Sequence, residues 1–330
     1  MARGDIYLGN ASAVGITPQA AGSTGGWDGT PHVLRYFTPI EGQAGLHIGR
    51  SQEPDPPTMA VDAESVTAGG SRCSGHFTIP LSYAYNEGLF GLIAGALAVK
   101  TEASAPYFHT STPARGPLYA TLAYYWDNYK GTKWLETITN ALITQLTITQ
   151  DPEKKPLLSG NWYAQKHART TPGAAPTLVT LEYPEWTDNV LTLGGATLNH
   201  YGLKLDIAWA AEEGKYGIGD ADNPAPIFVA RSAQRVTTLS VKTDDTDEIG
   251  DLLISGADIA TNSIVWNNGG TTTAEREIGI ALSSLRLKDT DLDRAKFGTL
   301  PVDLTLLAYG AAPFTIVSKN GLSAAEPPTS

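Results

Sequence analysis

The sequence predicts a mainly β protein built from two tandem β-sandwich or barrel domains, each with one short flanking helix. Three observations lead to this expectation. Glycine and proline are frequent, at 34 and 21 of the 330 residues, and indicate many turns. Short stretches in which apolar and polar residues alternate recur along the chain, as in half-buried strands. The third observation is an internal repeat, since self-similarity at a fixed separation indicates repeated structural units.

The repeat is clearest in two short segments. Residues 91–96 read GLIAGA and residues 252–257 read LLISGA, an offset of 161 with four of six positions identical. Each segment follows an alternating stretch, HFTIPLSYAY at 76–85 and RVTTLSVKT at 235–243, and then an opening that contains Asn, Asp or Glu. Such residues favour helix N-termini. The expected order is therefore strand, cap and helix in both halves.

Further strands agree with this order. At the same offset, residues 118–126 fall opposite 279–287, and a last strand follows at 143–150 and 301–308. Upstream, 44–49 matches 202–208. We expect an N-terminal arm at 1–29, domains at 30–172 and 177–320, a linker at 173–176 within TPGAAP, and a C-terminal tail at 321–330. One large sandwich with a coincidental match is the alternative.

Two long segments lie at equivalent places in the halves, at 50–71 and 212–226. Loops of this length between neighbouring strands are uncommon in compact domains and usually carry a function. The longest apolar run, 89–99, is too short to cross a membrane and predicts a buried helix. The N-terminal sequence MARGDIYLGN contains no apolar stretch of the secretory type.

Charge is sparse and unevenly distributed. Only 17% of residues are charged and 42% are hydrophobic, which is typical of a chain whose surface is buried by partners. Residues 1–172 carry 13 acidic and 12 basic residues, a net charge of −1. Residues 173–330 carry 21 and 11, a net charge of −10. This field opposes tight binding of DNA but is compatible with a surface along which DNA slides.

Motifs for catalysis, metals or cofactors are weak. The single cysteine, Cys73, excludes an intrachain disulfide and a cysteine-based zinc site. Residues 289–293, DTDLD, begin like a calcium loop, but Arg294 and Leu300 stand where an EF-hand needs Gly and Glu, so a solvated acidic turn is favoured. The six histidines lack ligand spacing. No nucleotide-binding or hydrolase motif is present, and we expect neither an enzyme nor a cofactor.

The first half resembles the tail tube proteins of long-tailed, siphovirus-like phages. The resemblance is carried by SGHFTIPLSYAYNEGLFGLIAGALA at 74–98, by residues 118–126 with YKGTKW at 129–134, and by the paired stretches ALITQLTITQ and PLLSGNWYAQK at 141–150 and 156–166. WTDNVLTLGGATL at 186–198 is similar to the start of the next module in longer members. The resemblance extends over about residues 35–320.

The resemblance implies a structural virion protein with two tail-tube-type domains, whose inner strands join those of neighbouring copies around a lumen. Stacked rings would form the conduit for genome ejection. Single-domain members form hexameric rings, so a two-domain chain implies a homotrimeric, pseudo-hexameric ring. The implied partners are further copies of the chain, tape measure and terminator proteins, and DNA that passes without specific binding. Assembly in the host cytoplasm and no membrane association are expected.

Two sets of residues are then candidates for function. The long loops would make contacts between stacked rings, through Arg50, Glu53, Asp55, Met59, Asp62, Glu64, Tyr216, Asp220 and Asp222. An acidic lumen that repels DNA would be formed by some of Asp206, Glu212, Glu213, Asp244, Asp245, Asp247, Glu248, Asp251 and Asp303. A phage decoration protein or a receptor- or carbohydrate-binding sandwich is the alternative, and a carbohydrate-active enzyme is the weakest one.

Overall fold

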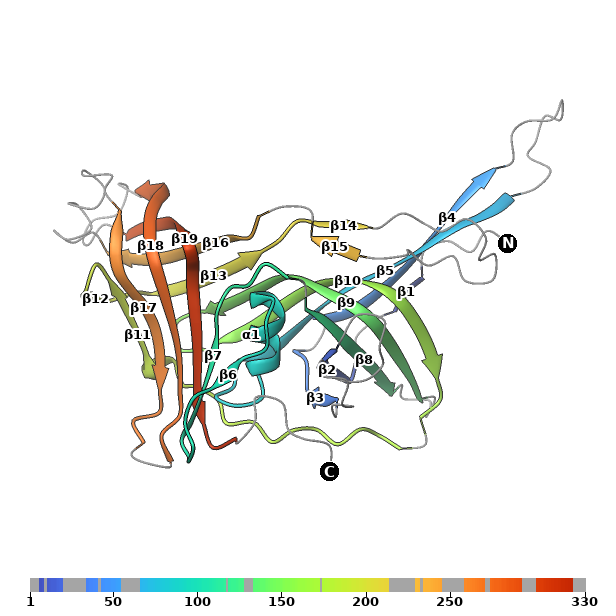
Figure 1. Ribbon diagram of the computed structural model, residues 1–330, viewed down its shortest axis with the longest axis horizontal. Coiled ribbons are helices and arrows are strands. Elements are labelled where there is room, and N and C mark those ends of the chain that lie inside the picture. Colours follow the sequence, from blue (N-terminus) through green and yellow to red (C-terminus); the bar gives the residue numbers. More distant parts are fainter. Residues whose placement is uncertain are drawn as a thin grey trace.

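Strands make up most of the computed structural model of the chain (Figure 1). The structure describes residues 6–8, 11–19, 34–40, 43–54, 66–116, 118–127, 133–172, 174–213, 229–231, 234–244, 258–270, 274–292 and 301–322. For some of them, including 6–8, 48–54, 66–72, 211–213 and 289–292, the description is of the backbone alone.

The described residues form nineteen strands, one α-helix and one 3-10 turn, which confirms the predicted mainly β class. The helix is α1 (Glu87–Ala94) and the turn is η1 (Trp186–Asp188). The strands are β1 (Ile6–Leu8), β2 (Ala13–Gln19), β3 (Arg35–Phe37), β4 (Ala44–Pro54), β5 (Val66–Pro80), β6 (Val99–Lys100), β7 (Tyr107–Ser111), β8 (Tyr119–Asp127), β9 (Lys133–Gln150), β10 (Leu157–Thr170), β11 (Asn189–Leu193), β12 (Ala196–Leu198), β13 (Gly202–Ala208), β14 (Ala211–Glu213), β15 (Val229–Arg231), β16 (Val236–Asp244), β17 (Ile259–Asn267), β18 (Glu277–Leu292) and β19 (Pro301–Asn320).

Seventeen of these strands belong to one hydrogen-bonded sheet, and every pair of named strands is antiparallel. Two series of neighbours can be followed through it. The first series runs β4, β5, β10, β9, β8, β2, β3. The second runs β13, β16, β19, β18, β17, β11, β12. Pairing of β13 with the last six residues of β9 joins the series, so the sheet continues from one to the other.

The two series match strand for strand in order and direction. Each contains a pair of long neighbouring strands, β9 with β10 and β18 with β19, and a β-bulge interrupts each pair. The residue skipped by the pairing is Thr144 in β9 and Lys288 in β18, and the β18–β19 pair has a second irregularity between Leu282 and Ser284. In sheet position β8 matches β17 and β9 matches β18, so beyond the helix the halves align at a smaller offset than 161. Residues 118–126 therefore correspond to β17 in the second half, and not to residues 279–287 as the sequence offset suggested.

Helix α1 is shorter than the apolar run 89–99 predicts. The helix ends where Gly95 adopts φ 88°, and the amide of Gly95 donates to the carbonyl oxygen of Gly91. Glycine reaches this left-handed conformation without a steric penalty, which makes it a common helix terminator. Val99 is exposed and begins β6. The GLIAGA segment is thus the end of a buried helix, whereas its counterpart at 252–257 lies outside the described residues.

The core follows from period-two alternation. Trp162 is buried between β5 and β9, its Nε1 donates to the Tyr124 hydroxyl at 2.7 Å, and that hydroxyl donates to the His76 carbonyl oxygen at 3.1 Å. Close packing here requires a glycine, because a Cβ on Gly75 would lie 2.4 Å from Cζ2 of Trp162. In the second series Trp266 is buried and donates to Oε1 of Gln150 at 2.8 Å. The indole N–H groups of Trp162 and Trp266 are therefore both satisfied inside the core.

Candidate assembly surface

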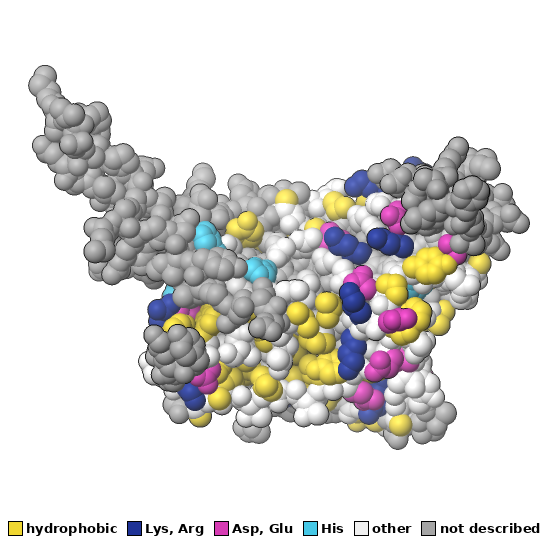
Figure 2. Space-filling model, turned by 180° about the vertical axis from the view of Figure 1, so that it is seen from behind, with side chains coloured by type: hydrophobic (Ala, Val, Ile, Leu, Met, Phe, Trp, Pro, Cys, Tyr) yellow, Lys and Arg dark blue, Asp and Glu magenta, His cyan; other side chains and the backbone are white. Residues whose placement is uncertain are grey.

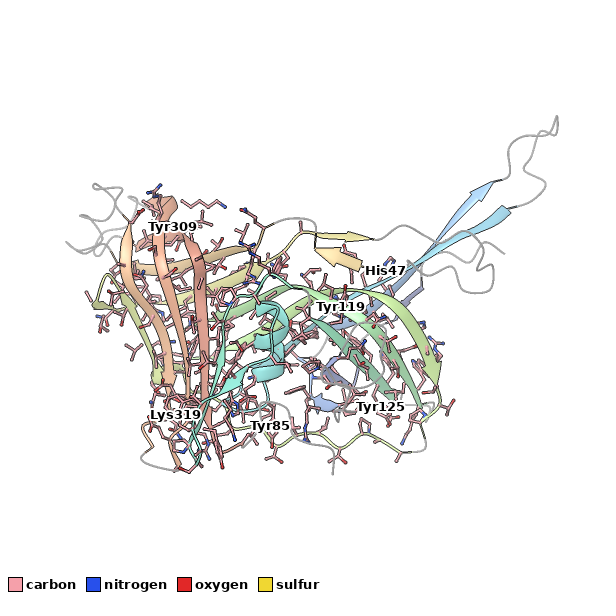
Figure 3. All side chains as sticks on the ribbon, in the orientation of Figure 1. His47, Tyr85, Tyr119, Tyr125, Tyr309 and Lys319 are labelled. Carbon is pink, nitrogen blue, oxygen red and sulfur yellow. The ribbon has the colours of Figure 1, made fainter. Side chains whose placement is uncertain are left out.

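Eight neighbouring strands form one continuous stretch of the sheet, in the order β4, β5, β10, β9, β13, β16, β19, β18. We call the side of this stretch that faces away from the apolar core the polar face. Its origin is alternation: in β16, Leu239 and Val241 are buried while Ser240 is half-buried and Lys242 is exposed. Figure 3 shows His47 on the β4 side of the molecule, and Tyr309 and Lys319 on the β19 side, with Tyr309 near the middle of that strand and Lys319 near its end.

The strand register arranges the side chains of the polar face in rows. One row runs Thr149, Lys204, Ser240, Thr305 across four strands. A second row runs Thr78, Ser159, Thr147, Asp206, Thr238 across five strands. Hydroxyl groups therefore outnumber charges in both rows.

Hydrogen bonds connect the side chains of the second row and its neighbours. The Thr78 and Ser159 hydroxyls lie 2.9 Å apart. The carboxylate oxygen Oδ1 of Asp206 accepts from Oγ1 of Thr147 and from Nε2 of Gln145, each at 2.6 Å. Such charge-assisted bonds hold the side chains in fixed positions. They cross from β9 to β13 and so bind the first series to the second.

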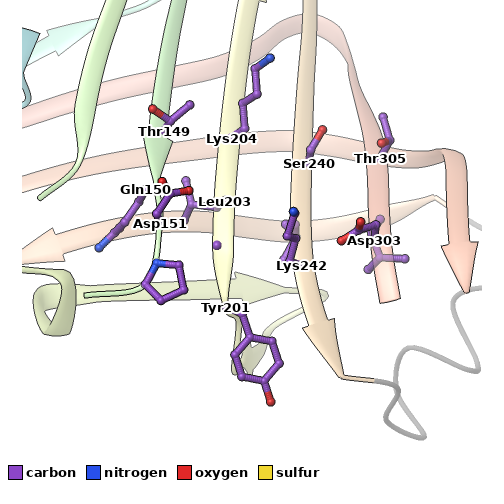
Figure 4. A pocket seen from close by; sticks show the side chains of 14 residues that line it. Thr149, Gln150, Asp151, Tyr201, Leu203, Lys204, Ser240, Lys242, Asp303 and Thr305 are labelled. Atoms are coloured by element: carbon purple, nitrogen blue, oxygen red, sulfur yellow. The ribbon is translucent and has the colours of Figure 1, made fainter. Parts of the chain in front are cut away.

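A pocket of about 600 Å³ opens on the polar face where β9, β13, β16 and β19 lie side by side (Figure 4). Its charged lining consists of Asp151, Lys204, Lys242 and Asp303. Two carboxylates and two ammonium groups leave this part of the surface with no net charge. On the face of the molecule in Figure 2, basic and acidic side chains are likewise interspersed.

The sequence-predicted acidic set is only partly brought together. Asp206 and Asp303 lie on the polar face. Asp244 ends β16, where it accepts a hydrogen bond from the Tyr201 hydroxyl. Glu212 and Glu213 belong to β14, described as backbone only. Four candidates lie outside the described residues: Asp245, Asp247, Glu248 and Asp251.

Sequence reasoning missed the two lysines on this face. Lys204 stands two residues before Asp206 in GLKLDIA, and Lys242 stands in TLSVKT. Period-two spacing places Lys204 on the same side of its strand as Asp206. A count of charges by halves could not show this pairing, because it averages over both sides of every strand.

The two long segments are less irregular than the sequence suggested. β4 runs on to Pro54 and β5 begins at Val66, so much of 50–71 is a strand pair, and Arg50 and Glu53 lie in β4. In the second segment, β14 pairs with β15. Backbone pairing continues here because it satisfies the N–H and C=O groups of both segments. The remaining loop candidates lie outside the described residues: Asp55, Met59, Asp62, Glu64, Tyr216, Asp220 and Asp222.

The end of helix α1 is held by the second series. Nη2 of Arg235 donates to the carbonyl oxygens of Ala94, at 2.7 Å, and Ala114, at 3.0 Å. Nε1 of Trp209 donates to the Ile93 carbonyl oxygen at 3.1 Å. The last carbonyls of a helix lack partners within the helix, so these bonds complete it. Burial lowers the pKa of Arg235 to about 10, which leaves it charged at neutral pH.

Other candidate chemistry from the sequence does not form a site. Cys73 is buried, and desolvation together with the charge of Glu136 raises the pKa of its thiol to about 12, which makes it unreactive. Residues 289–292 of the acidic DTDLD stretch belong to β18, not to a turn. Among the described residues, no three His, Cys, Asp or Glu side chains gather as metal ligands. No helix in the described part is long and apolar enough to span a membrane.

The fold and surface define a β-sheet protein with a broad polar face, on which acidic and basic side chains offset each other. The eight-stranded stretch beneath this face ends at the edges of β4 and β18. Residues 9–284 of the chain match the family of phage tail tube proteins. Because the match covers more than half of the chain, the chain belongs to this family. No curated protein matches it. Family membership makes it a structural component of the virion tail that self-assembles into a tube.

Proposed function

We propose that three copies of the chain close into a ring, that rings stack into the hollow tail tube, and that the genome is ejected through the lumen. The chain is then two tandem copies of one domain, each represented by one of the two strand series. The observation that carries the proposal is the continuous eight-stranded stretch with a polar face on one side. A ring of three such stretches pairs the β18 edge of one copy with the β4 edge of the next, so that neither edge is exposed.

The number of copies follows from the equivalence of the two series. If each series is one unit of a ring with six units, three chains complete that ring, and closed cyclic symmetry is the rule for homo-oligomers. The joint between β9 and β13 would then be repeated six times: three times within chains and three times between them. The extended β4–β5 and β14–β15 pairs, with the loop candidates beyond them, would contact the next ring.

The polar face would line the lumen. Phosphate binding needs an excess of Lys and Arg, since counterion release drives it. In the described part of the face, Asp206 and Asp303 offset Lys204 and Lys242, and hydroxyl groups fill the positions between them. DNA could slide past such a wall without being held. The remaining acidic candidates of the second half would add negative charge, which further opposes binding.

Electron microscopy of the purified chain tests the proposal. We expect rings or tubes with a central hole, three-fold symmetry and a pseudo-six-fold appearance in projection. A ring of six chains would overturn the trimeric part, and a chain that stays monomeric at high concentration would overturn the whole. Assembly in the host cytoplasm, and contacts with tape measure and terminator proteins, would be tested by co-purification from infected cells.

A further inference from the structure

The joint between the two series shows how one domain-sized unit meets the next. At this joint the first half of β9 pairs with β8, and its last six residues pair with β13. The pairing is antiparallel, with Leu203 opposite Gln150 and Ala208 opposite Gln145. The opposite edge of β13 is held by β16. The first unit therefore contributes the end of its bulged strand, β9. The second contributes the free edge of β13, whose other edge is paired with β16.

The eight-stranded stretch ends in two strands with corresponding edges, β18 at one end and β4 at the other. The first part of β18 pairs with β17 up to Leu285, as β9 pairs with β8. Residues 286–292 pair with β19 on one side, and no described strand lies on their other side. These two edges lie at opposite ends of the molecule (Figure 1). They are therefore placed to meet in two different copies, not within one chain.

In the single chain the β4 edge is already covered. The three-residue strand β1 pairs with it, with Tyr7 opposite His47 and Leu8 opposite Leu46. The Ala11 amide also donates to the Ala44 carbonyl oxygen at 3.3 Å. These are the positions on β4 that correspond to the part of β13 held by β9. The chain thus places its own N-terminal segment where the neighbouring unit would pair.

We propose that β1 is a guard strand, which covers the β4 edge of the unassembled chain and gives way to residues 286–292 of a second copy during ring closure. This inference rests on the proposed ring. An uncovered edge would pair at random with other strands, and natural proteins cover such edges. A three-residue strand provides few hydrogen bonds, so a seven-residue strand can replace it with a net gain in pairing.

The bulges predict the register of the new pair. Pairing across each series aligns His47 of β4 with the position two residues before the bulged Thr144 of β9, and Asp206 of β13 with the position two residues before the bulged Lys288 of β18, so His47 corresponds to Asp206. Asp206 lies opposite Thr147, which stands three residues after Thr144, as Asp291 stands three residues after Lys288. Asp291 of one copy should therefore lie opposite His47 of the next. Directly opposed residues in an antiparallel pair are close enough for a disulfide.

A reversible lock tests the guard. Because Tyr7 and His47 are paired, the double variant Tyr7→Cys/His47→Cys should form an intrachain disulfide that fixes β1 on β4. We expect this oxidised variant to lose ring formation and to regain it on reduction, while His47→Cys alone assembles under both conditions. Rings from the fully oxidised double variant would overturn the guard. Failure of the unmodified chain to form rings would instead overturn the proposed function.

A second pair of variants tests the partner edge. His47→Cys/Asp291→Cys should give disulfide-linked dimers and trimers in assembled protein, and no intrachain crosslink in diluted, unassembled protein. The control His47→Cys/Thr290→Cys moves one cysteine to the other side of the strand and should crosslink at least tenfold less. Equal crosslinking of the two variants, or none in assembled rings, would overturn the assignment of 286–292 as the edge that takes β4.

Discussion

The guanidinium carbon of Arg235 lies 4.1 Å from the centre of the Trp209 ring. Arg235 precedes β16 and Trp209 follows β13, so both come from the second strand series. Both donate to carbonyl oxygens at the end of helix α1, which belongs to the first half of the chain. The stacked pair therefore couples the two halves through the helix end, in addition to the hydrogen-bonded joint between β9 and β13.

Replacing Arg235 should weaken this coupling. Arg235→Ala removes the guanidinium donor from the Ala114 carbonyl oxygen and leaves the Ala94 carbonyl oxygen with the Ala114 amide alone, and we expect the free energy of unfolding to fall by about 2–4 kcal/mol. Denaturant unfolding of the unassembled chain measures this. The matched control is Arg286→Ala, which removes an exposed ion pair with Asp258 and should lower the free energy of unfolding much less, because solvent screens this pair. Equal losses in the two variants would contradict the assigned role.

Stability should depend on pH through Glu87. Burial raises the pKa of this carboxyl to about 7 in the folded chain, against 4.5 for an unperturbed group, although Asn320 donates to it. The folded state therefore binds a proton that the unfolded state has released between these pH values. Its contribution to stability is complete below pH 4.5 and is lost as pH rises toward 7, by roughly 3 kcal/mol.

The variant Glu87→Gln isolates this effect, since it is close in shape and does not titrate. We expect the difference in unfolding free energy between the variant and the unmodified chain to change steadily from pH 4.5 to 7 and to be constant above pH 8. Subtraction removes the contribution of other groups, including His109 and His200, whose pKa values burial lowers. A difference that is independent of pH would show that Glu87 is already charged at pH 5.

The polar face should become a DNA-binding surface when its charge is made basic. Ser240→Lys/Thr305→Lys adds two ammonium groups beside Lys204 and Lys242, at positions that neighbour each other in the register. We expect tubes of normal appearance that retain double-stranded DNA at low salt and release it as salt rises. Ser240→Asn/Thr305→Asn is the uncharged control. Absence of salt-dependent retention in the lysine variant would place this face outside the lumen.

Packing around Trp162 predicts a sharp requirement for glycine. A Cβ at position 75 would lie 2.4 Å from the Trp162 ring and 2.5 Å from the Gly45 carbonyl oxygen. Gly75→Ala should therefore lower the free energy of unfolding by about 1–3 kcal/mol, because the surrounding strands must move. Gly116→Ala is the control, since nothing lies within 4 Å of its added Cβ. Thermal unfolding of both variants decides the matter, and similar melting temperatures would refute the packing argument.

Much of the strand content could be predicted from alternation. The stretches 44–49, 143–150 and 202–208 lie in strands, 118–126 does so from residue 119 onward, and the apolar run 89–99 contains all but the first two residues of the described helix. The register could not be predicted, because it depends on which strands meet across long separations in sequence. The pairing of β9 with β13 is one example, and the position of Lys204 beside Thr149 follows from it.

The sequence by itself determined the mainly β class and the resemblance to tail tube proteins, because period-two alternation and turn residues are local signals. It also showed the repeated segment at 91–96 and 252–257, and in the first copy Gly95 ends the helix. Tertiary structure alone decided which charges share a face and which strand edges end the sheet. Those properties arise from pairing between distant segments, where backbone hydrogen bonds fix the register and the register sets every side-chain neighbour.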